Sequence, residues 1–320
     1  MAISAPFSSL TDENQIATGS ASVVYSINGI VALKCPIRYA SSSTQHEERQ
    51  VAFLRRQSEI SVNALEIEKG IFTVLEQAPH PNIVRCFLFA DEGIFLERLA
   101  TPLNVYLESV EIVPQPLKIR WLLELTSAVA WIEKLGFIHG DLRPENMLLT
   151  ENHHLKLVDF DCAVTPGENL QTFSEPYWLH KPDGSLDRAG PKSEQFALGS
   201  CLYFIFHETE PVIDIVDGQL DFPGLSSTPF APLIQKCWDG GFLSVRKLAL
   251  AALWNTARSG HIRVLLSFLY SSSIGFRKSR TSCGKIGPLK KLCQEYLDEQ
   301  RRVHLPSLAA PPQAIDIRRS

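Results

Sequence analysis

One stretch near the middle of the chain decides the fold. It reads Phe137-Ile138-His139-Gly140-Asp141-Leu142-Arg143-Pro144-Glu145-Asn146. An amphipathic segment over residues 117–135, which we expect to be helical, precedes it, and the apolar run Met147-Leu148-Leu149 follows it. A second acidic segment, Leu157-Val158-Asp159-Phe160-Asp161, comes next. Asp and Asn often do no more than cap a turn, but both segments together, in this order, indicate a catalytic site.

The two segments resemble the catalytic loop and the metal-binding motif of the eukaryotic protein kinases. The resemblance covers residues 16–248, and the motifs occur in the order that the family has. It implies that ATP and Mg²⁺ are the cofactors and that a protein is the substrate. The elements expected from the sequence agree, because a strand-rich first third is followed by a mostly helical remainder. We therefore predict an α+β, two-lobed fold with a small β-rich N-lobe and a larger helical C-lobe.

The resemblance also assigns roles to four residues around the phosphates. Phosphoryl transfer depends on positioning and charge neutralisation more than on covalent catalysis. Asp141 would orient the attacking hydroxyl, and Arg143 would stand near the transferred phosphate. Asn146 and Asp159 would hold magnesium, which prefers a few hard oxygen ligands.

A lysine upstream completes the expected phosphate site. Val31-Ala32-Leu33-Lys34 resembles the strand that carries the phosphate-binding lysine of the family. A lysine inside an apolar strand needs an acidic partner, because the burial of a lone charge is costly. Glu68 fits the family's spacing within a helix expected over residues 63–77, and Glu66 is the alternative.

The nucleotide-binding residues match the family less completely. Residues 17–24 align with the glycine-rich loop, but only Gly19 remains of its glycines. Val24, Ala32 and Leu148 would enclose the adenine ring, and residues Glu97 and Leu99 would form the hinge that binds its edge. The resemblance also predicts a stack between the lobes, formed by Phe72, Cys86, His139 and Phe160.

Four departures separate this chain from a routine member of the family. Gly140 stands in place of Arg, Asp161 in place of Gly, and Glu194 in place of Asp, and no A-P-E motif is recognisable near residues 174–178. None of the four removes a catalytic group. Without the Arg at position 140, a phosphate on Thr165, Thr172 or Ser174 has no docking partner there, so we expect activity independent of phosphorylation at these residues.

Composition limits the other possibilities. The chain has 320 residues and a formal net charge of −4, which gives no global signal for nucleic-acid or membrane binding. The first residues lack the pattern of a signal peptide. Seven scattered cysteines form no C-x-x-C pair. We expect a reducing compartment, the cytoplasm or the nucleus.

The predicted domain limits follow the motifs. We assign residues 1–14 to an N-terminal extension, and 15–256 to the kinase-like domain, with the N-lobe over 15–98 and the C-lobe over 99–256. Residues 257–320 stay unassigned, because 257–286 shows weak periodicity and the tail from Pro306 is expected to be poorly ordered.

Three functions fit these observations. The first is an active protein kinase, which would modify Ser or Thr rather than Tyr because Arg143 keeps a basic residue two positions after Asp141. The second is a nucleotide-binding pseudokinase that acts as a scaffold or binding module. The third is a small-molecule kinase of the same broad architecture, which usually lacks the Pro-Glu-Asn context of residues 144–146.

Overall fold

The computed structural model describes residues 3–39, 48–179, 188–217, 219–225, 228–281 and 283–304. Its first part is a five-stranded antiparallel sheet with the strand order β1-β2-β3-β5-β4. The strands are β1 (Gln15–Thr18), β2 (Ser22–Ser26), β3 (Val31–Pro36), β4 (Cys86–Phe89) and β5 (Ile94–Glu97). A short 3₁₀ turn, η1 (Asp12–Asn14), precedes the sheet.

The turn between β2 and β3 has the residues that a tight hairpin favours. Asn28 Oδ1 accepts hydrogen bonds from the backbone N–H groups of Ile30 and Val31, at 2.8 and 2.9 Å. The Ile27 N–H donates to the Val31 carbonyl at 3.0 Å. The side chain of Asn28 thus satisfies the backbone of the turn, as Asn commonly does. The pair Asn28-Gly29 predicts such a hairpin turn between two strands from the sequence alone.

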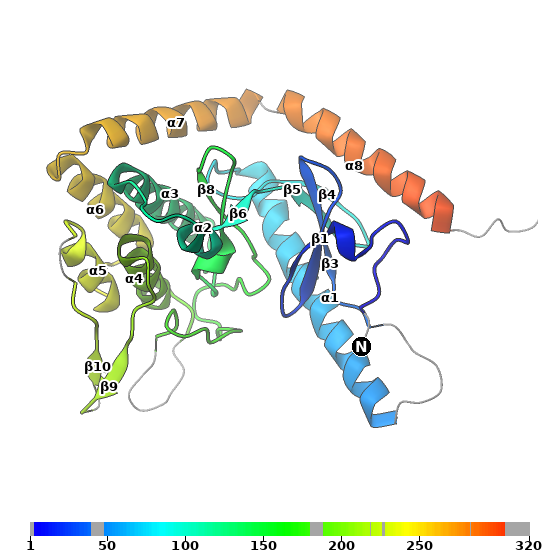
Figure 1. The fold of residues 1–320 in the computed structure, drawn as a ribbon, viewed down its shortest axis with the longest axis horizontal. Coiled ribbons are helices and arrows are strands. Elements are labelled where there is room, and N and C mark those ends of the chain that lie inside the picture. Colours follow the sequence, from blue (N-terminus) through cyan, green and yellow to red (C-terminus); the bar gives the residue numbers. More distant parts are fainter. Residues whose placement is uncertain are drawn as a thin grey trace, which may run out of the picture.

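Helix α1 (Glu48–Gln77) is longer than the sequence predicted. The expected helix covered only residues 63–77, where the apolar residues follow helical spacing. The added first half is rich in good helix formers, but it exposes Val51, Phe53 and Ile60 and so lacks a single apolar stripe facing the sheet. In Figure 1 this half extends past the sheet.

The second part is mostly helical. Its helices as far as residue 238 are α2 (Leu103–Ser109), α3 (Gln115–Lys134), η2 (Pro144–Asn146), α4 (Pro191–His207) and α5 (Ala231–Trp238). Strands β6 (Thr101–Pro102), β7 (Met147–Leu149) and β8 (Leu155–Leu157) form a small sheet, and β9 (Asp214–Val216) pairs with β10 (Gln219–Asp221). The described part of the chain therefore has the predicted α+β fold, with a β-rich N-lobe and a helical C-lobe.

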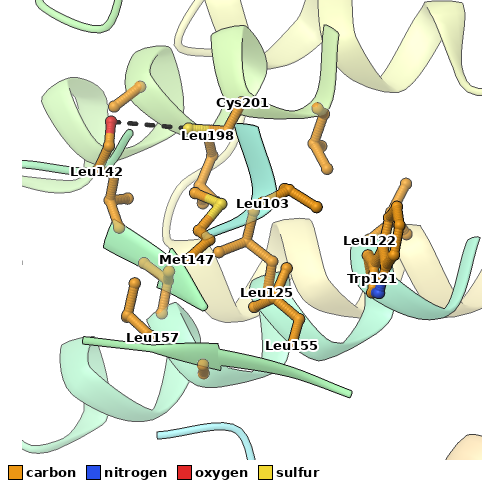
Figure 2. Close-up of a cluster of buried hydrophobic side chains, with 14 of the residues drawn as sticks. Leu103, Trp121, Leu122, Leu125, Leu142, Met147, Leu155, Leu157, Leu198 and Cys201 are labelled. Carbon is orange, nitrogen blue, oxygen red and sulfur yellow. Dashed lines mark hydrogen bonds between the residues drawn. The ribbon is translucent and has the colours of Figure 1, made fainter. Parts of the chain in front are cut away.

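A continuous apolar core holds the helical part together. Figure 2 shows Leu122 and Leu125 of α3 in the same cluster as Leu157 of β8 and Leu198 of α4. The thiol of Cys201 on α4 donates to the Leu142 carbonyl, with a sulfur–oxygen distance of 3.6 Å. The core thus also fixes the backbone of the 137–146 stretch, which lies between β7 and these helices.

Three further helices end the described chain: α6 (Val245–Arg258), α7 (Ile262–Thr281) and α8 (Cys283–His304). Residues 257–286 have no assignment from the sequence, yet most of them are helical. Helix α8 returns to the N-lobe, as Figure 1 shows, where Cys293 and Leu297 are buried against the sheet. Arg301 binds both carboxylate oxygens of Glu92, each at 2.8 Å. The expected tail from Pro306 lies outside the described residues.

No helix in the described part of the chain is long and apolar enough to span a bilayer.

Candidate active site

The sheet presents one face to the helical lobe. Val24 lies opposite Lys34 in the β2–β3 pairing, and Ala32 is two residues before Lys34 on the same strand. Side chains directly opposite each other, or two apart on one strand, share a face. The side chains of Val24, Ala32 and Lys34 therefore point to the same side. Val31 and Leu33, on the other face, are buried in the cluster that includes α8.

Lys34 binds two carboxylates, one from each lobe. Its Nζ lies 2.6 Å from Glu68 Oε2 on α1 and 2.6 Å from Asp159 Oδ1 after β8. Glu68 is completely buried, and its other oxygen accepts a hydrogen bond from the Phe160 N–H at 3.2 Å. The alternative partner, Glu66, pairs instead with Lys69 at the surface, at 2.7 Å. The structure thus places Glu68, and not Glu66, beside Lys34.

Burial and charge act against each other at this cluster. Burial alone would lower the pKa of Lys34, but the charges of Asp159 and Glu68 outweigh it and raise that pKa. Burial raises the pKa of Glu68 to about 7, and the Lys34 ammonium only partly opposes this change. At Asp159 the Lys34 ammonium prevails over burial and lowers the pKa. Burial, together with the Asp159 charge, raises the pKa of Asp161 to about 6. Lys34 and Asp159 are accordingly an ion pair at neutral pH.

The catalytic-loop segment brings three more predicted residues together. The Asn146 side-chain amide donates to the backbone carbonyl and to Oδ2 of Asp141, both at 2.9 Å. Ser174 donates its hydroxyl hydrogen to Asp141 Oδ1 at 3.0 Å, and Arg143 Nη1 donates to the Ser174 oxygen at 3.3 Å. Arg143 Nε also lies 3.1 Å from Glu145 Oε2. Asp141 is therefore held from both sides, with one oxygen facing a hydroxyl group.

Two of the departures from the family pattern meet in space. The Gly140 N–H donates to Glu194 Oε1 on α4 at 3.1 Å. Burial raises the pKa of Glu194 to about 7. The Glu194 carboxylate thus anchors the loop by binding the backbone of Gly140. It does so although the Glu side chain is one methylene longer than the Asp that the family has.

The backbone explains why position 140 holds glycine in this fold. Gly140 has φ +77°, in the left-handed region that favours glycine. A Cβ placed there would lie 2.6 Å from the carbonyl oxygen of Cys162. The bridge between Ile138 and Val164 holds these two segments side by side. Any side chain at position 140 would require the segments to separate.

The predicted stack between the lobes forms around Phe160. The Phe160 ring meets Phe72 edge-on at 5.6 Å between centroids and lies 5.1 Å from the His139 ring. Cys86 belongs to the same buried cluster as both phenylalanines. Burial lowers the pKa of His139, its Nε2–H donates to the Val158 carbonyl at 3.0 Å, and its Nδ1 accepts from the Asp141 N–H at 3.4 Å. His139 is therefore a neutral structural residue.

The nucleotide-binding candidates are less fully defined. The Gly19 N–H donates to the Ser22 carbonyl at 2.8 Å and closes the short turn between β1 and β2. The Glu97 carboxylate binds Lys156 at 2.7 Å. Among the described residues, no hydrogen bond from the Leu99 N–H is recorded, which leaves this hinge group available for a ligand. Leu148 lies on β7, directly after the catalytic loop, opposite Pro102 of β6 and Lys156 of β8.

The donor set near Asp159 fits magnesium. Asn146 uses its amide nitrogen for both hydrogen bonds to Asp141, which leaves its Oδ1 as a ligand for a metal ion. Asp159 uses Oδ1 for Lys34 and has a second carboxylate oxygen. No group of three or more His, Cys, Asp or Glu residues able to hold a metal occurs in the described ranges. A pair of hard oxygen donors without a protein cage is what magnesium uses beside substrate phosphates.

One contact at the site was not foreseen. The sequence indicates Ser174 only as a candidate phosphorylation site, yet its hydroxyl lies between Asp141 and Arg143. Ser174 is far from the catalytic loop in sequence, so no local pattern predicts this contact.

Comparison with known proteins places the chain in a family. The protein kinase domain family matches residues 11–219. The serine/threonine-protein kinase PKH3 of Eremothecium gossypii is 28% identical over 191 residues, 54% of this chain and 26% of the relative. Serine/threonine-protein kinase kin-29 of Caenorhabditis briggsae is 28% identical over 156 residues, 44% of this chain and 18% of the relative. Sperm motility kinase 2A of Mus musculus is 34% identical over 86 residues, 26% of this chain and 17% of the relative.

A two-lobed fold with a buried Lys–Glu pair and an Asp–Asn loop is the arrangement typical of protein kinase domains. The chain belongs to the protein kinase family. It spans about a quarter or less of the length of these curated relatives.

Proposed function

We propose that this domain is an active protein kinase that transfers the γ-phosphate of ATP to a Ser or Thr hydroxyl of a protein. The observation that carries the proposal is the position of Lys34, within 2.6 Å of both Glu68 and Asp159. Lys34 would neutralise the phosphates, and Glu68 would hold Lys34 in place. This pairing requires α1, β3 and the Asp159 segment to be assembled together, which is what catalysis in this family requires.

The remaining residues supply the other parts of the reaction. Asp141 would accept a hydrogen bond from the attacking hydroxyl, in the manner of its bond to Ser174. Arg143 carries positive charge beside that carboxylate. Asn146 and Asp159 would hold Mg²⁺, which neutralises charge on the phosphates when bound. The Val24, Ala32 and Leu148 side chains, with the hinge at Glu97–Leu99, would hold the adenine.

A nucleotide-binding pseudokinase is the second candidate. The turn that holds Gly19 has lost the other glycines that allow backbone N–H groups to approach phosphates. Asp161 adds a carboxylate beside Asp159. Both features would reduce transfer without preventing binding.

Thermal unfolding with and without ATP and magnesium tests nucleotide binding, which both candidates share. A ligand that binds only the native state raises the melting temperature by mass action. Millimolar Mg·ATP should raise it, and magnesium alone should not. No shift would overturn the proposal. Phosphoamino-acid analysis of a modified protein substrate should then find phosphoserine or phosphothreonine, and phosphotyrosine alone would contradict the assignment.

A further inference from the structure

The charges of this chain are distributed very unevenly. Residues 240–294 contain ten of the 31 Lys and Arg residues and none of the 35 Asp and Glu residues. The rest of the chain therefore has 21 cationic side chains against 35 carboxylates. The overall charge, which gave no signal for a membrane, averages a basic part and a strongly acidic part.

The basic part lies along one edge of the molecule. It covers α6, α7 and the beginning of α8, which Figure 1 shows at the left and top of the view. Helices α6 and α7 both contact α3 and each other. Their buried residues, such as Leu248, Ala252 and Phe268, face inward. The opposite faces of α6 and α7 consequently point away from the protein core.

These outer faces combine exposed apolar side chains with cations. On α6, Lys247, Leu250, Trp254 and Arg258 recur at helical spacing and are all exposed, with Trp254 at 65%. On α7, Ile262, Arg263, Leu266 and Tyr270 are exposed in the same way. No ion pair is recorded for Lys247, Arg258 or Arg263 with the described residues. We call these eight residues the α6–α7 face.

We propose that the α6–α7 face binds the surface of an anionic lipid bilayer. Helix faces with Lys and Arg beside Trp, Leu and Ile insert their apolar side chains at the boundary between headgroups and acyl chains, while the cations meet anionic headgroups. Nucleic acid would leave Leu250, Ile262 and Leu266 without an apolar partner. A bilayer also repels the acidic remainder of the chain, so the long-range field would turn the α6–α7 face toward the membrane.

The charge of the α6–α7 face can be reversed without weakening its helices. Lys247 is the third residue of α6, and its N–H donates to the capping Ser244 hydroxyl oxygen at 3.2 Å. Lys247→Glu would give the Ser-x-x-Glu pattern of a capping box. Arg263→Glu places a carboxylate in the first turn of α7, which the helix dipole favours. The matched control is Arg55→Glu with Arg56→Glu, which changes the net charge equally on the exposed surface of α1.

Co-sedimentation of the full chain with vesicles tests the proposal. Vesicles of phosphatidylcholine with about one third phosphatidylserine should bind the protein, and pure phosphatidylcholine should bind it much less. The Lys247→Glu, Arg263→Glu variant should bind at least about tenfold more weakly, since each basic residue near the surface is worth about fivefold. The α1 control should bind as the unmodified chain does. Melting temperatures of all variants check folding.

Tryptophan fluorescence gives a second readout. Trp254 is the most exposed of the five tryptophans, all of which lie in the described ranges. Its emission should shift to the blue on anionic vesicles, and Trp254→Phe should lose that shift. Absence of phosphatidylserine-dependent binding would overturn the proposal. Equal weakening by the α1 control, or binding to a short DNA duplex or to polyglutamate but not to vesicles, would overturn it as well.

Discussion

Nζ of Lys34 lies 2.6 Å from Oε2 of Glu68, and both side chains are almost completely inaccessible to solvent. A buried ion pair of this kind adds little net stability, but removal of one partner leaves an uncompensated buried charge. The pair therefore reports on the position of α1 against β3 and is also a point at which the fold is sensitive to substitution.

The first prediction concerns this pair. From the sequence, Lys34→Met is expected to spare folding and weaken transfer. The structure changes the first half of that expectation, because Glu68 would lose its cation. We now expect Lys34→Met to reduce the free energy of unfolding at pH 8 by about 2 kcal/mol or more. Urea denaturation measures this loss.

The double variant Lys34→Met, Glu68→Gln is the control for the Lys34 prediction. It removes the stranded charge and should recover part of the stability, but none of the transfer. Equal stability of the single and double variants would contradict the account of this pair.

The second prediction separates two acidic residues. Asp141→Asn should lower kcat by about 10²–10⁴-fold, the usual contribution of a positioned acid–base group, and should leave nucleotide affinity unchanged. Asp159→Asn should lower kcat and also weaken nucleotide affinity, because Asp159 binds Lys34 and is a candidate magnesium ligand. Titration of Mg·ATP against intrinsic fluorescence measures the affinity. The same loss of affinity in both variants would refute this division of roles.

The third prediction uses two glycines with similar backbone angles. Gly140 and Gly136 have φ of +77° and +89°. A Cβ at Gly136 meets nothing within 4 Å, whereas one at Gly140 meets the Cys162 carbonyl oxygen at 2.6 Å. Gly136→Ala should cost about 1 kcal/mol from backbone strain alone. Gly140→Ala should cost clearly more in urea denaturation and should also lower kcat. Equal losses of unfolding free energy in the two variants would contradict the importance of the close approach between Gly140 and the Cys162 carbonyl.

The fourth prediction concerns pH. Burial raises the pKa of Glu194 to about 7, above the value of about 4.5 in the unfolded chain. The native state therefore holds the proton more tightly, and this contribution to stability is lost as the pH rises from about 5 to beyond 7. Glu194→Gln keeps an oxygen for the Gly140 N–H and cannot ionise. Its stability should fall between pH 5 and pH 8 by about 2–3 kcal/mol less than that of the unmodified chain. Parallel pH profiles would contradict the prediction.

The fifth prediction concerns independence from phosphorylation at Thr165, Thr172 and Ser174. Ser174 contacts Asp141 directly, so its removal would perturb the catalytic loop whether or not it is ever phosphorylated. Thr165→Ala with Thr172→Ala is the cleaner test and should leave transfer unchanged before and after phosphatase treatment. Ser174→Ala alone should lower transfer in both conditions. A loss of about a hundredfold in the double Thr variant would show that an ordering step depends on these residues.

The sequence predicted the fold class more completely than the contacts within the candidate site. Phe137–Asn146 and Leu157–Asp161 were sufficient for the fold class, because local patterns and residue order carry that information. The Asn28-Gly29 pair also predicts the turn between β2 and β3, and helical patterns over residues 117–135, 193–206 and 230–238 predict α3, α4 and α5. The predicted domain boundary at residue 256 stays a prediction.

Contacts between distant segments were harder to foresee. The choice between Glu66 and Glu68 depended on which face of α1 meets β3, and only the assembled helix places Glu68 inward. Helix α7 was missed because its outer face is itself apolar, which blurs the periodicity. The contact of Ser174 with Asp141 and the tight approach of Gly140 to Cys162 depend on how the chain folds back, and no local pattern records this.

Magnesium-dependent transfer of labelled γ-phosphate from ATP to a generic protein substrate tests the central claim most directly. The unmodified chain and Asp141→Asn should be purified side by side, since both should bind Mg·ATP. We predict that the unmodified chain transfers phosphate and that transfer stops when magnesium is chelated. In Asp141→Asn the rate should be at least about a hundredfold lower. No transfer above the blank, despite a Mg·ATP-dependent rise in melting temperature, would contradict the claim and identify the domain as a pseudokinase.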